Sequence, residues 1–581
     1  MNKYRNNRCM IKVQRDFALT DDKNNARLLS TMAIILILFF VAISNSPKSI
    51  FAETFAKFYS QANAQAANNR WDKASDLYQK AFKIADDSNR HDVEEKLQLC
   101  QLNLAVQNRY VDGSVADQII NLSDADAKLL LQQVNTAVED RYYRDIDRKE
   151  SYKSALKQMR IALKSDRVFA LYNCDNKDLK ELDDELSKLI ETIDSSAVIA
   201  FENITAKLAL LSGKTDKIGL GKCWPQGEFA YAVISSLDKY SYLLSPSQYA
   251  AMYQRFGGFY VGLGVELSFG EDWPVVYDVV PGSPAQKSGI KSGDSLIKAN
   301  NIDLKNKNTS TISSILLGEE DSSIDVVVRR GQNELSFKVK RQLLSSPSVR
   351  NAKTITLDPV GSFQLTSNNN SKIAPKAGFL RISSFDRDTA IELRNVMEEL
   401  SKQNIESLII DLRNNGGGIM NSAIGASRLF LNDKIIVTVK EKKQSKKYRA
   451  GGDNFFYYQL PVVLLVNENT ASAAEIFTAA LKDNHRAIVI GNQTFGKAVV
   501  QSIYQFEKID SAICITTASY LGPSGFGFDK KGIMPDILVK KPLYNIKTAD
   551  FVTGLIDLEN PVMQTALKYL QKKSILHASN L

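Results

Sequence analysis

Strands and helices alternate along the sequence from Ala377 onward, and this alternation constrains the fold more than any other feature of the chain. Short apolar runs of strand length are separated by stretches of helix length. We expect strands at residues 378–382, 408–412, 461–466 and 487–491, and helices at residues 389–402 and 474–482. Such an alternation implies an α/β core.

The segment between residues 258 and 345 has an apolar period of two, which is typical of strands. A glycine loop formed by Gly262, Leu263, Gly264 and Val265 leads into a strand. The order of loop, strands, turn and short helix resembles a PDZ domain of the circularly permuted kind found in bacterial proteases. This resemblance implies that an extended peptide adds to the sheet edge, with its terminal carboxylate on N–H groups of the glycine loop. The alternative is a small β-domain without a ligand.

Residues 53–215 have the pattern of a helical region. Trp71, Ala74, Tyr78 and Ala81 recur at spacings of three and four, which gives one apolar helix face. The segment resembles one tetratricopeptide (TPR) helix pair, although a generic helical bundle explains it equally well. In the first interpretation the region offers a docking groove for an adaptor protein. In the second it serves packing alone.

An apolar run from Leu28 to Ile43 follows a basic flank and precedes small polar residues. This sequence of features predicts an export signal. The run is at the short end of the ~17–25 residues that span a bilayer, so a cleaved signal peptide and an uncleaved anchor over residues 28–46 both fit. A buried core helix is a third alternative. We expect a protein of the bacterial cell envelope, periplasmic or otherwise extracytoplasmic.

Charge and cysteine spacing narrow the class of partner and cofactor. The net charge is +9, and much of it precedes the apolar run, so the rest of the chain is only mildly basic. We therefore expect no nucleic-acid surface. The five cysteines are widely spaced and contain no metal-binding pattern, so we expect no metal site.

Ser472 lies at a predicted strand-to-helix junction, and a serine hydroxyl is a poor nucleophile until a base takes its proton. His91 and His485 lie in polar segments and His577 lies close to the C-terminus, so none of the three histidines is typical of a catalytic base. Lys497 follows in a later loop, and a neutral lysine amine can replace histidine as the base. A lone serine at a helix start is more often an N-cap. The joint occurrence of Ser472, Lys497 and a nearby glycine turn favours a catalytic pair.

A lysine base must be neutral. Its ordinary pKa is ~10.4, so lowering it to ~7–8 requires about 3–4 kcal/mol of bias against the charged form. The apolar neighbours Phe495 and Val499 would supply this bias through burial. Gln501 can accept from the amine and fix its direction without adding charge. For the developing oxyanion, the backbone N–H groups of Ala473 and of Gly417 or Gly418 are candidate donors.

The segments at residues 411–418, 470–472, 494–497 and 532–536 occur in the order of the carboxy-terminal processing (tail-specific) serine proteases. Residues from about 216 to 540 resemble that family. The resemblance implies Ser472 as nucleophile, Lys497 as general base and Gln501 as its orienter. It also implies an oxyanion hole from the amides of Ala473 and Gly418, on a ClpP/crotonase-like core. Ala498 replaces the usual glycine, which would cost activity if that position needed a positive φ.

We therefore predict a multidomain α+β protein. Its parts are an N-terminal membrane or signal segment (residues 1–52), a helical, TPR-like domain (53–215), a partly helical linker (216–257), a PDZ domain (258–345), an α/β protease core (346–545) and a C-terminal helical tail (546–581).

The predicted function is that of an exported serine endopeptidase that cleaves proteins near their C-termini through an acyl-enzyme, without a metal or organic cofactor. Its expected partners are protein or peptide substrates with exposed C-termini, an adaptor on the helical domain, and the membrane through the N-terminal segment. One alternative is a catalytically weak or inactive PDZ and helical scaffold protein. Another is an esterase on the same α/β scaffold, which does not explain the PDZ-like segment.

Overall fold

The computed structural model describes residues 52–111, 113–172, 179–196, 199–268, 272–305, 307, 309–357, 363–365, 375–451, 460–509, 511–539 and 558–578. The chain divides into two compact units, Met1–Leu104 and Ala105–Leu581. The division lies within the helical region 53–215. The apolar run at residues 28–46 is outside the described residues. Of the helices that are described, none is both long and apolar enough to cross a membrane.

The first unit is helical. It contains a helix at residues 52–67, then α2 (Trp71–Ile84), and most of α3 (Asp87–Arg109), which continues into the second unit. Ala74, Tyr78 and Ala81 of α2 are buried, together with Val93 and Cys100 of α3. The apolar face predicted from the spacing of three and four is therefore the packed face of α2.

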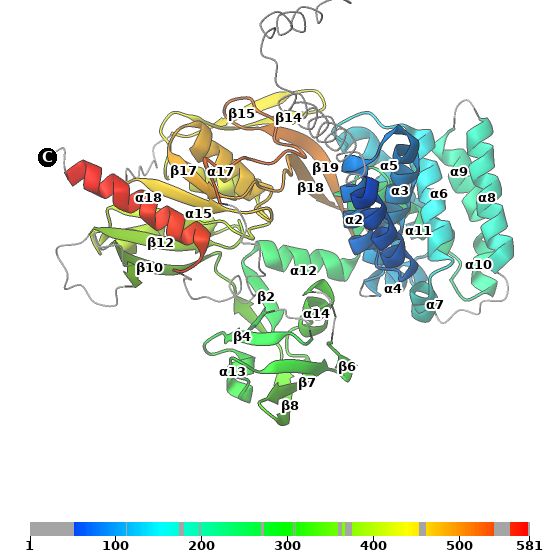
Figure 1. Cartoon of the computed structure of the whole chain (residues 1–581). Coiled ribbons are helices and arrows are strands. Elements are labelled where there is room, and N and C mark those ends of the chain that lie inside the picture. Colours follow the sequence, from blue (N-terminus) through cyan, green and yellow to red (C-terminus); the bar gives the residue numbers. More distant parts are fainter. Residues whose placement is uncertain are drawn as a thin grey trace, which may run out of the picture. The chain divides into compact units, whose positions relative to one another are not determined.

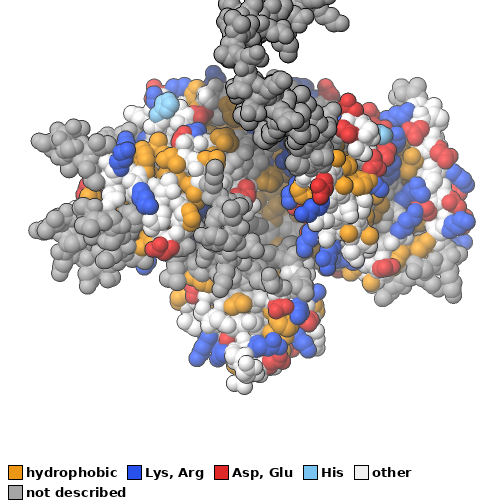
Figure 2. Space-filling view, viewed as in Figure 1, with side chains coloured by type: hydrophobic (Ala, Val, Ile, Leu, Met, Phe, Trp, Pro, Cys, Tyr) orange, Lys and Arg blue, Asp and Glu red, His pale blue; other side chains and the backbone are white. Residues whose placement is uncertain are grey.

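The second unit begins with a helical bundle (Figure 1). Its helices are α4 (Ser114–Ile120), α5 (Asp124–Arg141), α6 (Arg148–Ala162), α7 (Asp166–Tyr172), α8 (Leu179–Ser195), α9 (Phe201–Ala209), α10 (Ser212–Lys217) and α11 (Trp224–Ser235). Helix α11 is buried on nearly all sides. Most of its residues are apolar, and its buried Glu228 forms an ion pair with Arg109. Over the outer helices, basic and acidic side chains are mixed rather than segregated (Figure 2), as in the pair formed by Arg160 and Asp183.

The bundle shares a hydrophobic cluster with the α/β part of the chain. Ile513 and Ile515 of strand β19 (Ala512–Leu521) are fully buried in the same cluster as Trp224 and Phe229 of α11. The turn after α11 leads to β1 (Tyr242–Leu244), which pairs antiparallel with β19. The bundle and this sheet are therefore packed as one body.

A PDZ domain follows helix α12 (Pro246–Phe256). Its elements are β2 (Phe259–Gly262), β3 (Val265–Ser268), β4 (Val275–Val279), α13 (Pro284–Ser288), β5 (Ser295–Ala299), β6 (Ile302–Asp303), α14 (Thr309–Leu316), β7 (Ser323–Arg330), β8 (Asn333–Lys340) and β9 (Gln342–Ser345). One sheet has the order β3-β4-β5-β7-β8, with β6 on β5, while β2 pairs with β9 in a separate ribbon. Leu263, Val276 and Ile312 lie in the core of the domain.

The α/β core is built on a sheet of order β11-β10-β12-β13-β16-β17-β20, in which the strands from β12 to β20 are parallel. The strands are β10 (Val349–Leu357), β11 (Phe363–Leu365), β12 (Lys376–Ile382), β13 (Ser407–Asp411), β16 (Val462–Val466), β17 (Ala487–Gly491) and β20 (Ile537–Leu538). The predicted α/β alternation is confirmed. A second sheet contains β1, β19, β14 (Ile435–Glu441), β15 (Ser445–Arg449) and β18 (Val499–Gln505).

Helices cover both faces of the parallel sheet (Figure 1). Helices α15 (Thr389–Ser401), α16 (Met420–Arg428) and α17 (Ala473–Asp483) pack on the face that includes Leu464 of β16. On the other face, Val463 and Leu465 pack against α18 (Pro561–Ala578) through Leu567. Successive side chains of a strand point to opposite faces, so the uninterrupted apolar run of β16 is explained by its two covers.

Candidate active site

Three loops of the core meet at one edge of the parallel sheet. The glycine turn follows β13, the loop with Ser472 follows β16, and the loop with Lys497 follows β17. These strands are neighbours in the order β13, β16, β17 and run parallel. The carboxyl ends of parallel strands share an edge, which is where α/β proteins build their sites. Residues far apart in the sequence are brought together in this way.

Ser472 is the N-cap residue of α17 and has a strained backbone, with φ 57° and ψ −117°. A positive φ is uncommon for a residue with a side chain, and such outliers concentrate at functional sites. The loop is fixed by neighbouring backbone. The Ala471 N–H donates to the Asn415 carbonyl oxygen (2.9 Å), and the Thr470 hydroxyl donates to the Leu412 carbonyl oxygen (2.9 Å). The surrounding loop therefore holds Ser472 in this conformation.

Glu475 joins the serine loop to the lysine loop. Its buried carboxylate accepts from the backbone N–H groups of Ser472 (2.9 Å), Lys497 (2.9 Å) and Gly496 (2.7 Å), and from the Thr494 hydroxyl (2.5 Å). Burial raises the pKa of Glu475, while these hydrogen bonds act against the rise. Glu475 is not among the site residues predicted from the sequence. The spacing Ser-x-x-Glu at a helix start is a capping-box signal that could have found it.

Lys497 is half-buried, and its Nζ lies 4.7 Å from the centroid of the Tyr240 ring. Burial lowers the pKa of the Lys497 amine, and the charge of Lys239 acts in the same direction, against Asp238 and Glu475. The shift has the direction that a lysine base requires.

Tyr520 contacts both loops. Its hydroxyl donates to the Lys497 carbonyl oxygen (2.7 Å) and, over a longer distance of 3.3 Å, to Ser472 Oγ. Burial raises the pKa of this phenol, so it stays protonated. The described contacts include no direct hydrogen bond between Ser472 Oγ and Lys497 Nζ. Catalytic hydrogen bonds commonly shorten only when substrate is bound.

Gln501 lies on β18, at a bulge between Val500 and Gln501. Its Nε2 is buried and has no hydrogen-bond partner among the described residues. A half-turn of the amide would exchange this nitrogen for the oxygen, which is an acceptor. The role of Gln501 in orienting the lysine amine stays a prediction.

The two glycines of the turn differ in what their N–H groups do. Gly417 has φ 100°, and a Cβ there would lie 2.7 Å from Ser472 Cβ and 2.9 Å from Ala473 N, so a side chain does not fit. The Gly417 N–H already donates to Asn415 Oδ1 (2.8 Å). Within the described part of the chain, the N–H groups of Gly418 and Ala473 have no acceptor. These two amides are therefore the ones free to bind an oxyanion.

Ala498 has an ordinary negative φ, since it is absent from the positive-φ residues that the structure describes. Its carbonyl oxygen accepts from the Tyr520 N–H (3.1 Å). The departure from the glycine of the resembled family therefore introduces no backbone strain.

The predicted glycine loop of the PDZ domain is held in place through its carbonyl groups. Gly264 has φ 81°, and a Cβ there would lie 2.2 Å from Ser283 Cβ. The carbonyl oxygens of Leu263 and Gly264 accept from the N–H groups of Ala285 (2.8 Å) and Val280 (2.9 Å), but their own N–H groups have no acceptor in the described residues. Gly262 ends β2 and Val265 begins β3.

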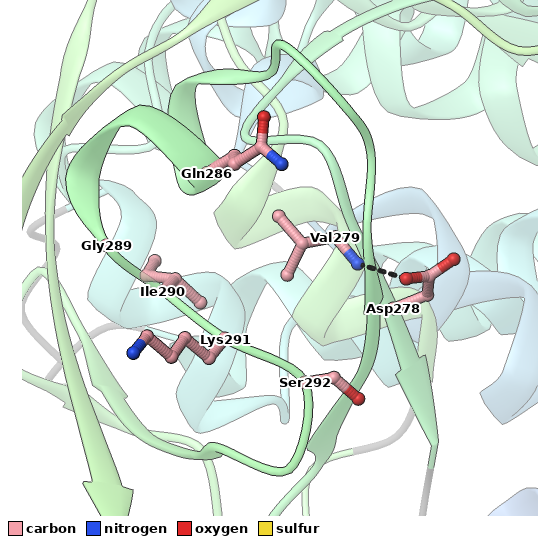
Figure 3. A pocket seen from close by; sticks show the side chains of 7 residues that line it. All are labelled: Asp278, Val279, Gln286, Gly289, Ile290, Lys291 and Ser292. Carbon is pink, nitrogen blue, oxygen red and sulfur yellow. Dashed lines mark hydrogen bonds between the residues drawn. The ribbon is translucent and has the colours of Figure 1, made fainter.

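A separate cavity of about 370 Å³ lies on the same domain, between β4 and the end of α13 (Figure 3). It is lined by Asp278, Val279, Gln286, Gly289, Ile290, Lys291 and Ser292. None of the four predicted peptide-binding residues contributes to it, and Figure 3 shows the Val279 N–H donating to the Asp278 carboxylate (2.8 Å). This cavity is therefore distinct from the glycine loop.

Comparison with known proteins gives consistent matches. The profile of peptidase family S41 matches residues 376–539, which include Ser472, Lys497 and Gln501, and a PDZ-domain profile matches residues 275–330. The chain is 30% identical to a probable CtpA-like serine protease of Staphylococcus aureus (strain MRSA252), over 62% of this chain and 73% of that protein.

Two further relatives extend the comparison. The chain is 29% identical to the chloroplastic C-terminal processing peptidase of Tetradesmus obliquus, over 52% of this chain and 64% of that protein. The solved photosystem II D1 C-terminal processing protease is 24% identical, with a TM-score of 0.41, over 77% of this chain and 98% of that one. The chain thus spans just under two thirds of the Tetradesmus protein. The chain belongs to the C-terminal processing peptidases of family S41, which are serine-type peptidases that carry a PDZ domain.

Proposed function

We propose that the protein is a serine endopeptidase that cleaves protein substrates near their C-termini, with Ser472 as nucleophile and Lys497 as general base. One observation carries this proposal. The buried Glu475 carboxylate joins the backbone of a strained Ser472 to the backbone of Lys497, whose pKa is lowered by burial. A serine next to a neutral amine is an activated nucleophile.

The proposed reaction has two halves. Lys497 takes the proton of Ser472 Oγ as the oxygen attacks the scissile carbonyl carbon, and the oxyanion accepts from the N–H groups of Gly418 and Ala473. The Lys497 ammonium then donates its proton to the leaving amine, which breaks the peptide bond and leaves an acyl-enzyme. In the second half, Lys497 takes a proton from water as the water oxygen attacks the ester carbonyl carbon. The Lys497 ammonium then returns a proton to Ser472 Oγ as the ester C–O bond breaks, which releases the new C-terminus and restores the serine hydroxyl.

The PDZ domain supports recognition of protein substrates. The unengaged N–H groups of Leu263 and Gly264 suit a terminal carboxylate, and β3 is the edge strand of the PDZ sheet beside this loop. We propose that this domain holds the substrate's C-terminus while an upstream peptide bond enters the catalytic loops.

The proposal includes the place of action. A basic flank followed by the apolar run supports export, with residues 28–46 as signal or anchor and the catalytic parts outside the cytoplasm. The helical region would be the surface for an adaptor protein.

The test is covalent labelling and cleavage by the purified protein. A fluorophosphonate probe should label the wild type at Ser472, and a peptide that carries a free C-terminus should be cut. Ser472→Ala should lose both activities, and Lys497→Ala should lose at least 100-fold in labelling rate, as is common when a general base is removed. An unlabelled wild type would favour the alternative of an inactive PDZ scaffold. Full activity in either variant would exclude the proposed mechanism.

A further inference from the structure

The turn between α11 and β1 contains a second lysine, Lys239. Its amine lies near that of Lys497. Its Nζ is 4.9 Å from the centroid of the Tyr240 ring and 5.3 Å from the centroid of the Phe495 ring. The Nζ of Lys497 is 4.7 Å from the centroid of the same Tyr240 ring. The two amines are thus less than about 10 Å apart, a range at which charges in a partly desolvated site still interact.

The charge of Lys239 is not neutralised by an ion pair. Among the described residues, no carboxylate lies within ion-pair distance of its amine. The two carboxylates that act on it, Asp238 and Asp529, are engaged elsewhere. Asp238 accepts from the Tyr240 N–H (2.8 Å) and the Tyr142 hydroxyl (3.2 Å), and Asp529 accepts from the Ala498 N–H (3.5 Å). Two aromatic rings hold the Lys239 amine instead, which is the geometry of cation–π contacts.

We propose that Lys239 is a positioning residue whose positive charge keeps the neighbouring Lys497 amine in its neutral, proton-accepting form. A like charge nearby disfavours protonation, and a second cationic group is one of the known ways to activate a lysine. The side chain of Lys239 is exposed, whereas that of Lys497 is half-buried. Partial burial lowers the pKa of the Lys239 amine as well, but its side chain is the more exposed of the two. Water therefore stabilises the charge on Lys239 better than the charge on Lys497, and Lys497 is the amine that gives its proton up. The inference rests on the proposed function.

The other ionisable groups near Lys497 are either neutral or favour its charged form. Cys514 on β19 would oppose deprotonation of Lys497 only if its thiol were charged. Burial raises the pKa of this thiol to about 11, so the thiol is neutral near pH 7. Asp238 and Glu475 favour the charged lysine, and the Tyr240 and Tyr520 hydroxyls are neutral because burial raises their pKa values. Lys239 is therefore the cation that offsets these carboxylates, since Lys530 acts on Lys239 itself.

The pH dependence of Ser472 labelling tests this inference in the full-length chain. The second-order rate of labelling by a fluorophosphonate rises with pH as Lys497 loses its proton. In Lys239→Gln we expect this rise to move to higher pH by about 0.5–1 unit, the size of one charge at this range and exposure. Lys239→Arg keeps the charge and should stay close to the wild type. High salt should reduce the difference between the wild type and Lys239→Gln.

Lys531→Gln is a matched control, because Lys531 is an exposed lysine whose Nζ lies 5.8 Å from the centroid of the Phe526 ring. This variant should leave unchanged the pH at which the Ser472 labelling rate is half its maximum, the midpoint of the pH dependence. The inference is overturned if Lys239→Gln and wild type share one midpoint, or if Lys239→Gln only weakens peptide binding, which would assign Lys239 to a substrate carboxylate. A wild type that labels at no pH overturns the proposed function, and the role of Lys239 with it.

Discussion

Glu475 is the residue that makes the site a unit, because one carboxylate satisfies donors from both catalytic loops. Replacement by Gln puts an NH₂ group among these donors. We expect Glu475→Gln to lower the free energy of unfolding by about 2–3 kcal/mol, the cost of buried donors left unpaired, and to slow Ser472 labelling as well. Urea denaturation measures the first effect and a fluorophosphonate the second.

The control for this variant is Glu399→Gln. Glu399 of α15 forms an exposed ion pair with Lys402, the residue that follows the helix. Such surface pairs contribute little to stability. Loss of this ion pair in Glu399→Gln should change the free energy of unfolding by less than about 0.5 kcal/mol. If the two variants unfold at the same urea concentration, Glu475 does not link the loops.

At the residue scale, the sequence indicates candidates for the groups with distinctive chemistry but not the residues that contact them. Ser472 and Lys497 could be chosen because their types, neighbours and order suit acyl transfer. Tyr240 and Tyr520 could not, since one comes from a turn and the other from β19. Only strand pairing brings them to the site, and no local pattern encodes that pairing.

At the scale of elements, a buried ion pair ties the end of β13 to α18. Arg413 donates to both oxygens of Asp411 (2.9 and 2.8 Å) and to Asn560 Oδ1 (2.9 Å), just before α18 begins. Burial alone would raise the pKa of Asp411, but Arg413 outweighs burial and the pKa is lowered. The pair therefore makes stability depend on pH.

The sign of this dependence follows from the lowered pKa. The folded-state pKa of Asp411 lies below its unfolded value of ~3.9, so the pair stabilises the fold above that pH, and the gain is lost as the pH falls through the folded-state pKa. Asp411→Asn removes the carboxylate charge that faces Arg413 and should cost about 3–5 kcal/mol at pH 7. The difference from wild type should shrink toward pH 2. Urea denaturation at both pH values checks this, and a constant difference would contradict it.

The elements of the core were predictable where local periodicity determines them. The strands expected at residues 408–412 and 461–466 correspond to β13 and β16 within about one residue, the usual uncertainty of element ends. The covering role of α18 was not predictable, because an apolar helix near a chain end has many possible partners. The pairing of β1 with β19 joins segments about 270 residues apart and has no local signal either.

At the scale of the whole molecule, the second unit should unfold cooperatively. Ile513 and Ile515 of β19 are buried against helices of the bundle. These helices lie outside residues 376–539, the part of the chain that the S41 profile matches. A fragment of residues 346–545 would expose this apolar surface and lose α18 as well. We expect this fragment to be insoluble or to bind a hydrophobic dye, whereas residues 105–581 should show one thermal transition. A soluble, cooperatively folded fragment would contradict this view.

The strained backbone at Ser472 also implies a trade-off between thermal stability and activity. A residue with a side chain at φ 57° and ψ −117° carries strain of about 1–3 kcal/mol, which glycine relieves in part. A Ser472→Gly protein should therefore be inert yet melt at a higher temperature than its parent. Selection for heat resistance alone, without a demand for turnover, would be expected to remove the proposed nucleophile.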